Sequence, residues 1–559
     1  MIRLARHLLR MSRIGWTFAR YGALDIAADL GPGPALLVRA LRPLRRRDLA
    51  PRPGQRLAAA CTELGPSFIK FGQALSCRAD LLGDDTAADL SALRDRLPPF
   101  PVGEVYRVIE AEFGRPAKDL FATFDETPIA AASIAQVHFA TTAADPSASG
   151  VPAPDSITSD LFQSVIGPVD PPMPAGTQVA IKVLRPGVEQ SLARDLDLFA
   201  WLAGLLERFF PTVRRLKPIE VVDTFRESVV LEMDLRFEAA AASELRQNFK
   251  MHETASDRGS SSALAAGRFK VPAIDWQRTA RRVMTQERIV GTPFGDRDAL
   301  IAAGHDLDAI LATAAEAMFV QVFRDGFFHA DMHPGNFFVE PDGTLVAVDF
   351  GIMGRLDEST RLFLAEMLIG FLTGDYRRVA EVHFRAGYVP AHKSVDTFTQ
   401  ACRSIGEPIL GRPLHDISVG RLLAQLLRVA DTFEMETQPQ LLLLQKTMVL
   451  AEGGGRILNP NVNMWQLSQP LIEQWVRDNL GPQARLQRGA RDTLAALERF
   501  PALLTDLEQA TARLAEGEVK LSDRAARTLG EASGRGTALP IWLVVILLAS
   551  ILGVLLLGQ

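Results

Sequence analysis

Cysteine is scarce in this chain. Only Cys61, Cys77 and Cys402 occur in 559 residues, and they form neither a C-x-x-C pair nor a metal-ligand spacing. This pattern excludes a disulfide framework and a structural zinc site built from cysteine. A reducing compartment is therefore expected.

The chain also lacks a large excess of positive charge. The formal net charge is −5, which gives no general basis for binding nucleic acid, so no nucleic-acid partner is expected. Hydrophobic residues make up 47% of the sequence, enough at this length to build two or more cores. More than one domain is therefore expected.

The N-terminal segment, residues 1–56, departs from this acidic balance. It holds twelve arginines and three aspartates. Arginines interrupt every apolar run, which excludes a secretory signal peptide. Between them stand apolar residues such as Leu4, Leu8 and Phe18, so an amphipathic helix is expected. That helix either lies on an anionic membrane surface or is an ordinary arginine-rich solvated helix.

The C-terminal run from Leu539 to Leu557 contains nineteen residues without a charge. As a helix it would reach about 28 Å, close to the thickness of a hydrocarbon core of about 30 Å. Basic residues precede it and none follows, which places the bulk of the protein on the cytoplasmic side. The sequence thus predicts a transmembrane anchor over 539–557.

The stretch from Phe327 to Arg355 carries the strongest chemical signal. It reads FFHADMHPGNFFVEPDGTLVAVDFGIMGR, in which Asp331 precedes Asn336 in a tight Pro-Gly turn and a strand ends at Asp349-Phe350-Gly351. Two carboxylates and a carboxamide so placed match a phosphoryl-transfer site. Asp331 would accept a proton from the nucleophile, or orient it, and Asn336 and Asp349 would hold Mg²⁺. A metal-hydrolase site built on His329, Asp331 and His333 is the alternative for this stretch.

A phosphate-covering loop is expected at Pro128–Ala140, between two strands, but its glycines are missing. Ala130-Ala131-Ala132 carry Cβ atoms that restrict the backbone, so the loop would cover a nucleotide with altered geometry. The following residues, 141–176, are rich in Ser, Pro, Asp and Ala and are expected to form a long insertion.

The strand Gln178–Val183 carries Lys182, which is costly to bury unless it meets an anion. A single helix is expected over Glu220–Asn248, and its Glu232 or Glu238 could pair with this lysine. Further strands are expected at Phe269–Ile274 and Arg281–Ile289.

Helical spacing covers Leu307–Arg324 and long stretches of residues 355–500, in which Gln440–Leu450 is interpreted as core. Another helix-like segment, Leu64–Leu82, holds Lys70, Gly72 and Gln73. From composition alone Lys70 could be a lysine that extends from a core helix to solvent.

Together these motifs resemble the UbiB (aarF/ADCK) family of atypical kinase-like proteins linked to ubiquinone biosynthesis. The resemblance runs from about Leu64 to about Leu458. Its elements are the K-x-G-Q segment from Lys70 to Gln73, the alanine-rich loop Ala130–Ser133, the strand lysine Lys182, the E-x-D of Glu232 and Asp234, and the catalytic loop with D-F-G.

The resemblance implies an α+β, two-lobe, atypical kinase-like fold with an N-terminal helical extension and a C-terminal transmembrane helix. It implies binding of ATP with Mg²⁺ and an atypical kinase or ATPase activity that supports quinone synthesis at a membrane, most simply the bacterial inner membrane. The expected partners are ATP, a quinone-type lipid or its biosynthetic enzymes, and the membrane. Asp331, Lys182, Lys70 and Gln73 would be catalytic and Asn336 and Asp349 would bind metal. The nucleotide would contact Ala130, Ala131, Ala132, Ser133, Ile134, Ala135, Gln136, Val137, His138, Lys182, Glu232, Asp234 and Glu238.

The expected segments follow from these assignments. They are a basic N-terminal segment (1–56), a K-x-G-Q helical extension (57–120), a nucleotide-binding lobe (121–292, with the insertion 141–176), a helical lobe (293–500), a linker (501–538) and the anchor (539–557). Two other functions fit parts of the sequence. One is a small-molecule phosphotransferase of the aminoglycoside or choline kinase type, and the other is a non-catalytic, nucleotide-binding scaffold for quinone-synthesis enzymes.

Overall fold

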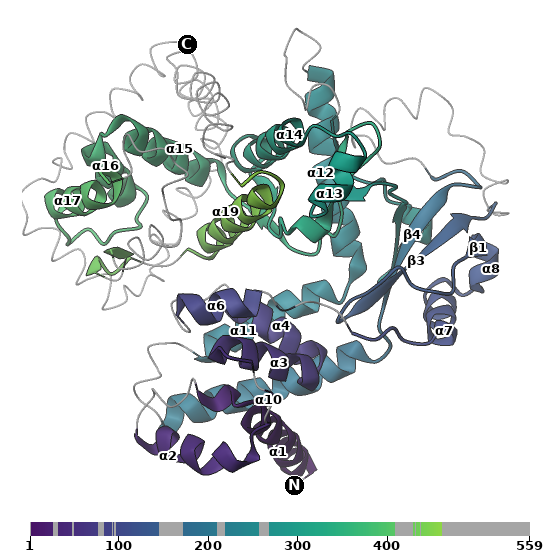
Figure 1. The fold of residues 1–559 in the computed structure, drawn as a ribbon, viewed down its shortest axis with the longest axis horizontal. Coiled ribbons are helices and arrows are strands. Elements are labelled where there is room, and N and C mark those ends of the chain that lie inside the picture. Colours follow the sequence, from purple (N-terminus) through teal and green to yellow (C-terminus); the bar gives the residue numbers. More distant parts are fainter. Residues whose placement is uncertain are drawn as a thin grey trace, which may run out of the picture. The chain divides into compact units, whose positions relative to one another are not determined.

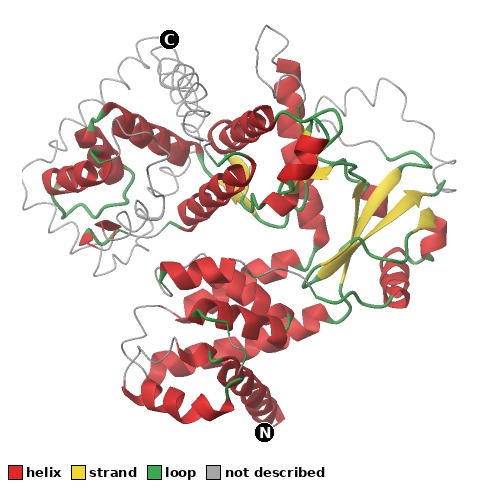
Figure 2. Cartoon of the chain, in the orientation of Figure 1, coloured by secondary structure: helices red, strands yellow, loops and turns green. Residues whose placement is uncertain are grey.

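A computed structural model describes the chain over residues 2–25, 32–46, 48, 50–76, 83–91, 93, 97–144, 172–209, 218–255, 268–408, 429–430, 432–435 and 438–460. The chain divides into two compact units, 1–474 and 475–559, and all described residues belong to the first. Figures 1 and 2 show that this unit combines groups of helices with small sheets.

The N-terminal helices form the first group. They are α1 (Ile2–Tyr21), α2 (Pro32–Leu41), the short η2 (Arg42–Leu44), α3 (Pro53–Leu64), α4 (Pro66–Ser76) and α6 (Asp84–Ser91). Gly65 adopts a φ of 101° between α3 and α4, and Pro66 then starts α4, so the chain reverses sharply at this point. In Figure 1 this group lies beside α10 (Val188–Phe209) and α11 (Pro218–Glu232).

Helix α1 is the amphipathic helix that the sequence predicts, and part of one face packs on the protein itself. The guanidinium of Arg10 binds both carboxylate oxygens of the buried Asp195 on α10 at 2.9 Å. Phe18 meets the ring of Phe68 on α4 edge to face. Trp16 remains 53% exposed. Binding of this helix to a membrane stays a prediction.

The first sheet is antiparallel. Its strands are β1 (Phe121–Phe124), β2 (Ala130–Ala131), β3 (Ala135–Thr142), β4 (Gln178–Leu184) and β6 (Val283–Glu287), in the order β1-β3-β4-β6 with β2 paired to β3. The helices α7 (Val102–Phe113) and α8 (Ala117–Leu120) lie beside it (Figures 1 and 2), and α7 closes an apolar core with β4 and β6. The strand-turn-strand expected over 128–140 is thus confirmed.

One expected helix is in fact two. The chain leaves α11 at Glu232 and starts α12 (Leu235–Ala255) after Met233 and Asp234. The Asp234 carboxylate accepts the backbone N–H of Arg236 at 3.1 Å, in the manner of a helix-capping residue. The prediction of one continuous helix over 220–248 is therefore wrong. In the sequence, a capping aspartate cannot be distinguished from an ordinary charged residue on a helix surface.

The second sheet lies in the larger lobe. Its strands are β5 (Phe269–Lys270), β7 (Thr292–Pro293), β9 (Phe337–Val339) and β10 (Leu345–Ala347), in the order β5-β10-β9-β7, and a separate pair joins β8 (Phe327–His329) to β11 (Met353–Arg355). Of the expected strand over 269–274, only Phe269 and Lys270 form strand, and they pair with β10 instead of the first sheet. A single bridge from Ile274 to Gln286 links the remainder to β6.

Further helices belong to this larger lobe. They are α13 (Arg297–Ala302), α14 (Leu307–Phe319), the π-helical η6 (Val320–Asp325), α15 (Glu358–Thr373), α16 (Tyr376–Arg385), α17 (Val395–Gly406) and α19 (Pro439–Leu458), with short 3-10 turns η5 (Trp276–Arg278) and η7 (Pro334–Asn336). The helix expected over 307–324 is confirmed as α14 continued by η6. Asp306 begins it by accepting the N–H groups of Asp308 and Ala309.

No helix within the described ranges is long and apolar enough to span a bilayer. The transmembrane segment expected at 539–557 and the linker at 501–538 lie outside those ranges.

Candidate functional site

Lys182 is the centre of the site. Its Nζ lies 2.6 Å from Glu238 Oε1 and 3.2 Å from Asp349 Oδ1. These three residues come from β4, from the first turn of α12 and from the end of β10, respectively. The choice between two glutamates is thereby settled in favour of Glu238. The structure brings a strand lysine, a helix glutamate and the D-F-G aspartate together, as a kinase-type site requires.

The protonation states in this cluster follow from burial and charge. Burial opposes the charge of Lys182, but the carboxylates of Asp349 and Glu238 outweigh it and raise the pKa of the amine. The positive charge of Lys182, with a contribution from Lys70, lowers the pKa of Asp349 below its ordinary value. Asp349 therefore stays ionised at neutral pH, as a ligand for a divalent cation must.

Asp349 is also conformationally unusual. Its φ is 63°, a left-handed value that is uncommon for residues other than glycine. The backbone turns sharply here after β10, so the carboxylate is 53% exposed while the neighbouring Phe350 is buried. Such strain is frequently found where a side chain is held in place for function.

The catalytic loop joins β8 to β9. Asn336 donates from Nδ2 to the Asp331 side chain and to its backbone carbonyl, both at 3.0 Å. The backbone carbonyl of Asn336 accepts the N–H of Val348 at 2.8 Å, which ties this loop to the strand that leads to Asp349. Asp331, Asn336 and Asp349 are therefore held by one hydrogen-bonded framework.

The donor atoms fit magnesium. Asp349 supplies an ionised carboxylate, and the Asn336 amide nitrogen is engaged with Asp331, which leaves its oxygen as the atom for a metal. In phosphoryl-transfer sites Mg²⁺ is typically bound by one or two protein oxygen ligands, and phosphate and water oxygens complete its coordination. Asn336 and Asp349 are therefore the residues that would hold it.

The two loop histidines have structural partners. His329 is buried, and its Nδ1 accepts the N–H of Asp331 at 3.2 Å. Burial lowers the pKa of this imidazole, which keeps it neutral and able to accept that bond. His333 Nδ1 accepts the N–H of Gly335 at 3.0 Å. Among the described residues no group of three or more His, Cys, Asp or Glu side chains gathers as a metal site.

The K-x-G-Q segment contributes α4 to the same region. Lys70 Nζ lies 3.0 Å from Glu232 Oε2, at the end of α11. Gln73 donates to the carbonyl of Leu93 at 3.4 Å. A Cβ at Gly72 would stand 2.5 Å from Leu93 Cδ1, so any larger residue here would require the Leu93 side chain to shift. Of the two acidic residues in the E-x-D motif, Glu232 thus pairs with Lys70, while Asp234 binds Arg236 at 2.6 Å.

The alanine-rich segment Ala130–Ser133 begins in β2 and continues into the turn that leads to β3. The N–H of Ala132 bonds to the carbonyl of Ala135 at 2.7 Å, and the carbonyl of Ile134 accepts the N–H of Arg185. The Ser133 hydroxyl is buried and has no hydrogen-bond partner in the described structure. Ala130 and Ala131 form the β2 strand itself.

The β3 residues that were expected to contact the nucleotide lie on opposite faces of the sheet. Val137 is paired with Lys182 across β3 and β4, so their side chains share a face. Gln136 and His138 alternate with Val137 and point to the other face. There Gln136 bonds to the backbone of Phe100, and His138 bonds to the carbonyl of Asp125 at 2.7 Å. The structure therefore does not bring the side chains of Gln136 and His138 to Lys182.

Helix α19 adds residues that the sequence analysis did not assign to the site. Lys446 Nζ stands 4.0 Å from Asp331 Oδ1, and the buried Thr447 hydroxyl donates to the carbonyl of Ala330 at 3.2 Å. The available signal was a lysine inside the apolar run QLLLLQKTMVL, which needs an anion just as Lys182 does.

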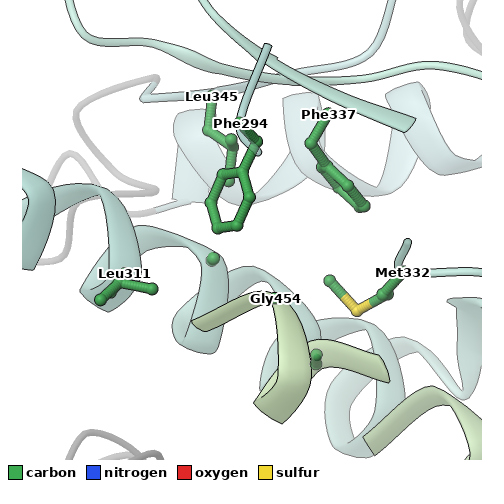
Figure 3. A pocket seen from close by; sticks show the side chains of 8 residues that line it. Phe294, Leu311, Met332, Phe337, Leu345 and Gly454 are labelled. Carbon is green, nitrogen blue, oxygen red and sulfur yellow. The ribbon is translucent and has the colours of Figure 1, made fainter. Parts of the chain in front are cut away.

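An apolar cavity underlies the catalytic loop. Figure 3 shows Met332, within the loop, and Phe337, directly after it, opposite Gly454 of α19. A Cβ at Gly454 would lie 3.2 Å from Pro334 Cγ, so α19 lies directly against the loop. The cavity lining is Phe294, Leu311, Ala314, Met332, Phe337, Leu345, Ala451 and Gly454, which gives it no polar group for a ligand.

Two family models match the chain. The ABC1 atypical kinase-like domain matches residues 92–148 and 172–383, and the UbiB helical domain matches residues 402–463. The first match contains Lys182, Asp331 and Asp349, and the second contains Lys446. A solved structure, described as a complex of Rv3197 with erythromycin from Mycobacterium tuberculosis, is 24% identical with a TM-score of 0.44 and covers 78% of this chain and 98% of its own.

Curated relatives cover most of the chain. A protein named "Probable protein kinase UbiB" from Marinobacter nauticus is 41% identical over 504 residues, which are 88% of this chain and 83% of the relative. Proteins of the same name from Aeromonas salmonicida (41% over 465 residues, 82% and 77%) and Pseudomonas aeruginosa (38% over 516 residues, 88% of each) are similarly related. This chain belongs to the UbiB family of atypical kinase-like proteins.

Proposed function

We propose that this chain binds Mg-ATP and acts as a membrane-anchored atypical kinase or ATPase that supports ubiquinone biosynthesis. The observation that carries the proposal is the convergence of Lys182, Glu238 and Asp349, with Asp331 and Asn336 on the adjoining loop. Each position that handles phosphate, metal or proton in such a site holds a competent side chain.

The residues divide the chemistry among them. Lys182, oriented by Glu238, would bind the α- and β-phosphates. Magnesium, when bound by Asn336 and Asp349, supplies neutralisation of the phosphate charge. Asp331 would accept the proton of the attacking hydroxyl, either water or an acceptor. Its side chain is 34% exposed, so the nucleophile can reach it from solvent.

The K-x-G-Q helix narrows the range of acceptors. Lys70 and Glu232 form a partly buried ion pair, each side chain 13% exposed, and Lys70 acts electrostatically on Asp349. A helix held so near the metal-binding carboxylate leaves less room for a folded protein substrate. Water or a small hydroxyl compound is therefore favoured as the acceptor.

Metal dependence tests the nucleotide site. An Asp349→Asn variant should bind Mg-ATP about ten-fold or more weakly, since an amide replaces a carboxylate that faces a divalent ion. In EDTA, without Mg²⁺, the Asp349→Asn variant should bind ATP at least as tightly as the parent. In the variant Lys182 no longer shares its charge with the Asp349 carboxylate. Calorimetric titration with ATP, with and without Mg²⁺, measures both conditions.

Asp298→Asn is the matched control, since this side chain is 97% exposed on α13. It should behave as the parent does in both conditions. Equal affinity of the parent and Asp349→Asn for Mg-ATP would contradict the assigned metal site.

Membrane attachment is the second part of the proposal. Removal of residues 539–559 should move the protein from the membrane fraction toward the soluble fraction, because nineteen uncharged residues supply the hydrophobic insertion. High-salt washing then distinguishes any remaining electrostatic binding by the basic N-terminal segment. A truncated protein that sediments with membranes as fully as the intact one, even in high salt, would exclude the tail as the anchor.

A further inference from the structure

Lys446 occupies a place that the assigned functions leave unexplained. It comes from α19, within the match to the UbiB helical domain, yet its Nζ lies 4.0 Å from Asp331 Oδ1. The side chain is 21% exposed, so most of it is buried beside the catalytic loop. A lysine held there needs an anionic partner.

The position of Lys446 is fixed by the helix that carries it. The next residue, Thr447, is fully buried, and its hydroxyl lies 2.8 Å from the Leu443 carbonyl of the same helix and 3.2 Å from the carbonyl of Ala330, immediately before Asp331. Two turns further on, Gly454 brings the helix backbone against Pro334. Helix α19 therefore contacts the loop at Ala330 and at Pro334, and Lys446 lies next to the first of these contacts.

Other lysines near the site have closer partners. Lys182 is 2.6 Å from Glu238, and Lys70 is 3.0 Å from Glu232. The loop from Asp331 to Asn336 contains neither lysine nor arginine. At 4.0 Å, the contact from Lys446 to Asp331 is at the outer limit of an ion pair, which leaves the ammonium able to take a second anion.

We propose that Lys446 binds the transferred γ-phosphoryl group of the nucleotide. This inference rests on the proposed function. As the nucleophile attacks, its oxygen forms a bond to the γ-phosphorus and the bond from that phosphorus to the bridging oxygen breaks. The electron pair leaves with the nucleoside diphosphate, and the proton of the nucleophile passes to Asp331. Lys446 stabilises the equatorial oxygens of the phosphoryl group while it lies between nucleophile and leaving group.

This role differs from that of Lys182. Lys182 is placed to hold phosphates that remain on the diphosphate product, whereas Lys446 stands on the side of the proton acceptor. The affinity for a nucleotide that lacks the γ-phosphate should therefore not depend on Lys446. The distinction between triphosphate and diphosphate provides a binding test that does not depend on turnover.

The experiment compares Lys446→Ala, Lys446→Arg and the parent as full-length proteins. Binding of Mg-ATP and Mg-ADP is titrated, and ATP hydrolysis is measured over a range of ATP concentrations. For Lys446→Ala we expect kcat to fall about 10- to 100-fold. The preference for ATP over ADP should shrink by about ten-fold, with Mg-ADP affinity unchanged within about two-fold. Lys446→Arg should restore part of the ATP preference.

Arg456→Ala is the control on the same helix, because Arg456 is solvent-exposed and pairs with Glu452 of α19 itself. It should match the parent in every measurement. Equal losses of ATP and ADP affinity in Lys446→Ala would overturn the proposal, since the lysine would then act by holding the loop. An unchanged kcat and ATP preference would also overturn it. A parent that fails to bind Mg-ATP would instead refute the proposed function, and this inference with it.

Discussion

An Asp331→Asn variant should bind Mg-ATP as tightly as the parent and hydrolyse it about a hundred-fold or more slowly. A positioned general base contributes about 10²- to 10⁴-fold to a rate. The amide keeps the shape of the carboxylate, and its oxygen can still accept the Asn336 hydrogen bond seen at 3.0 Å. It cannot accept the proton of the nucleophile. The loss should therefore appear in kcat and leave nucleotide affinity intact.

The measurement is ATP turnover at saturating Mg-ATP, beside a calorimetric titration of the same preparation. Asp298→Asn again serves as the control and should retain parental turnover. The comparison with Asp349→Asn separates the two carboxylates, because that variant should lose Mg-ATP affinity. If Asp331→Asn lost affinity to the same extent as Asp349→Asn, the division of roles between proton acceptor and metal ligand would be wrong.

The core of the site could be predicted because its motifs are local. Asp331 and Asn336 belong to one loop, and Asp349 follows the second strand of the β9–β10 pair that comes after this loop. Their spacing along the chain fixes most of their spacing in space. Lys182 was predictable for a different reason, since a lysine on an apolar strand needs an anionic partner.

The partner of Lys182 could not be chosen from the sequence. The sequence places Glu232 and Glu238 in one expected helix, whereas in the structure α11 ends at Glu232 and Asp234 caps the start of α12. The break separates the two glutamates, which then serve two lysines, Glu232 for Lys70 and Glu238 for Lys182. The capping interaction at Asp234 determines which glutamate pairs with which lysine. Hydrophobic periodicity does not reveal this cap, because the helical pattern continues across it.

The remaining features of the site depend on packing between segments that are far apart in the sequence, which the sequence alone does not reveal. The side chains of Gln136 and His138 were expected near the nucleotide, but the register of β3 against β4 turns them away from Lys182. Lys446 was assigned to core because its neighbours are apolar. Only the docking of α19 on the catalytic loop, through Thr447 and Gly454, brings it to Asp331.

The largest expected effect on stability lies in the first sheet, at the buried pair of Asp275 and Arg278. Both side chains are almost fully buried, and Arg278 Nη1 lies 2.7 Å from Asp275 Oδ2. The same guanidinium donates to the carbonyls of Leu120 and Ala143, at 3.0 and 2.8 Å. It thereby ties the turn before β6 to the start of β1 and to the residue just after β3.

Asp275→Ala should lower the free energy of unfolding of this lobe by about 3–5 kcal/mol, because the guanidinium stays buried without its counter-charge. Arg278→Met should also be costly, since the Asp275 carboxylate loses its buried counter-charge and two backbone carbonyls each lose the hydrogen bond from the guanidinium. The double variant should lose less stability than the sum of the two single variants, because no uncompensated charge remains.

Urea unfolding, together with hydrogen exchange of β1, β3 and β6, measures the loss of stability in this lobe. Asp396→Ala, which removes the exposed partner of Arg377, should cost about 1 kcal/mol or less. Strict additivity in the double variant would show that the two buried charges do not stabilise each other.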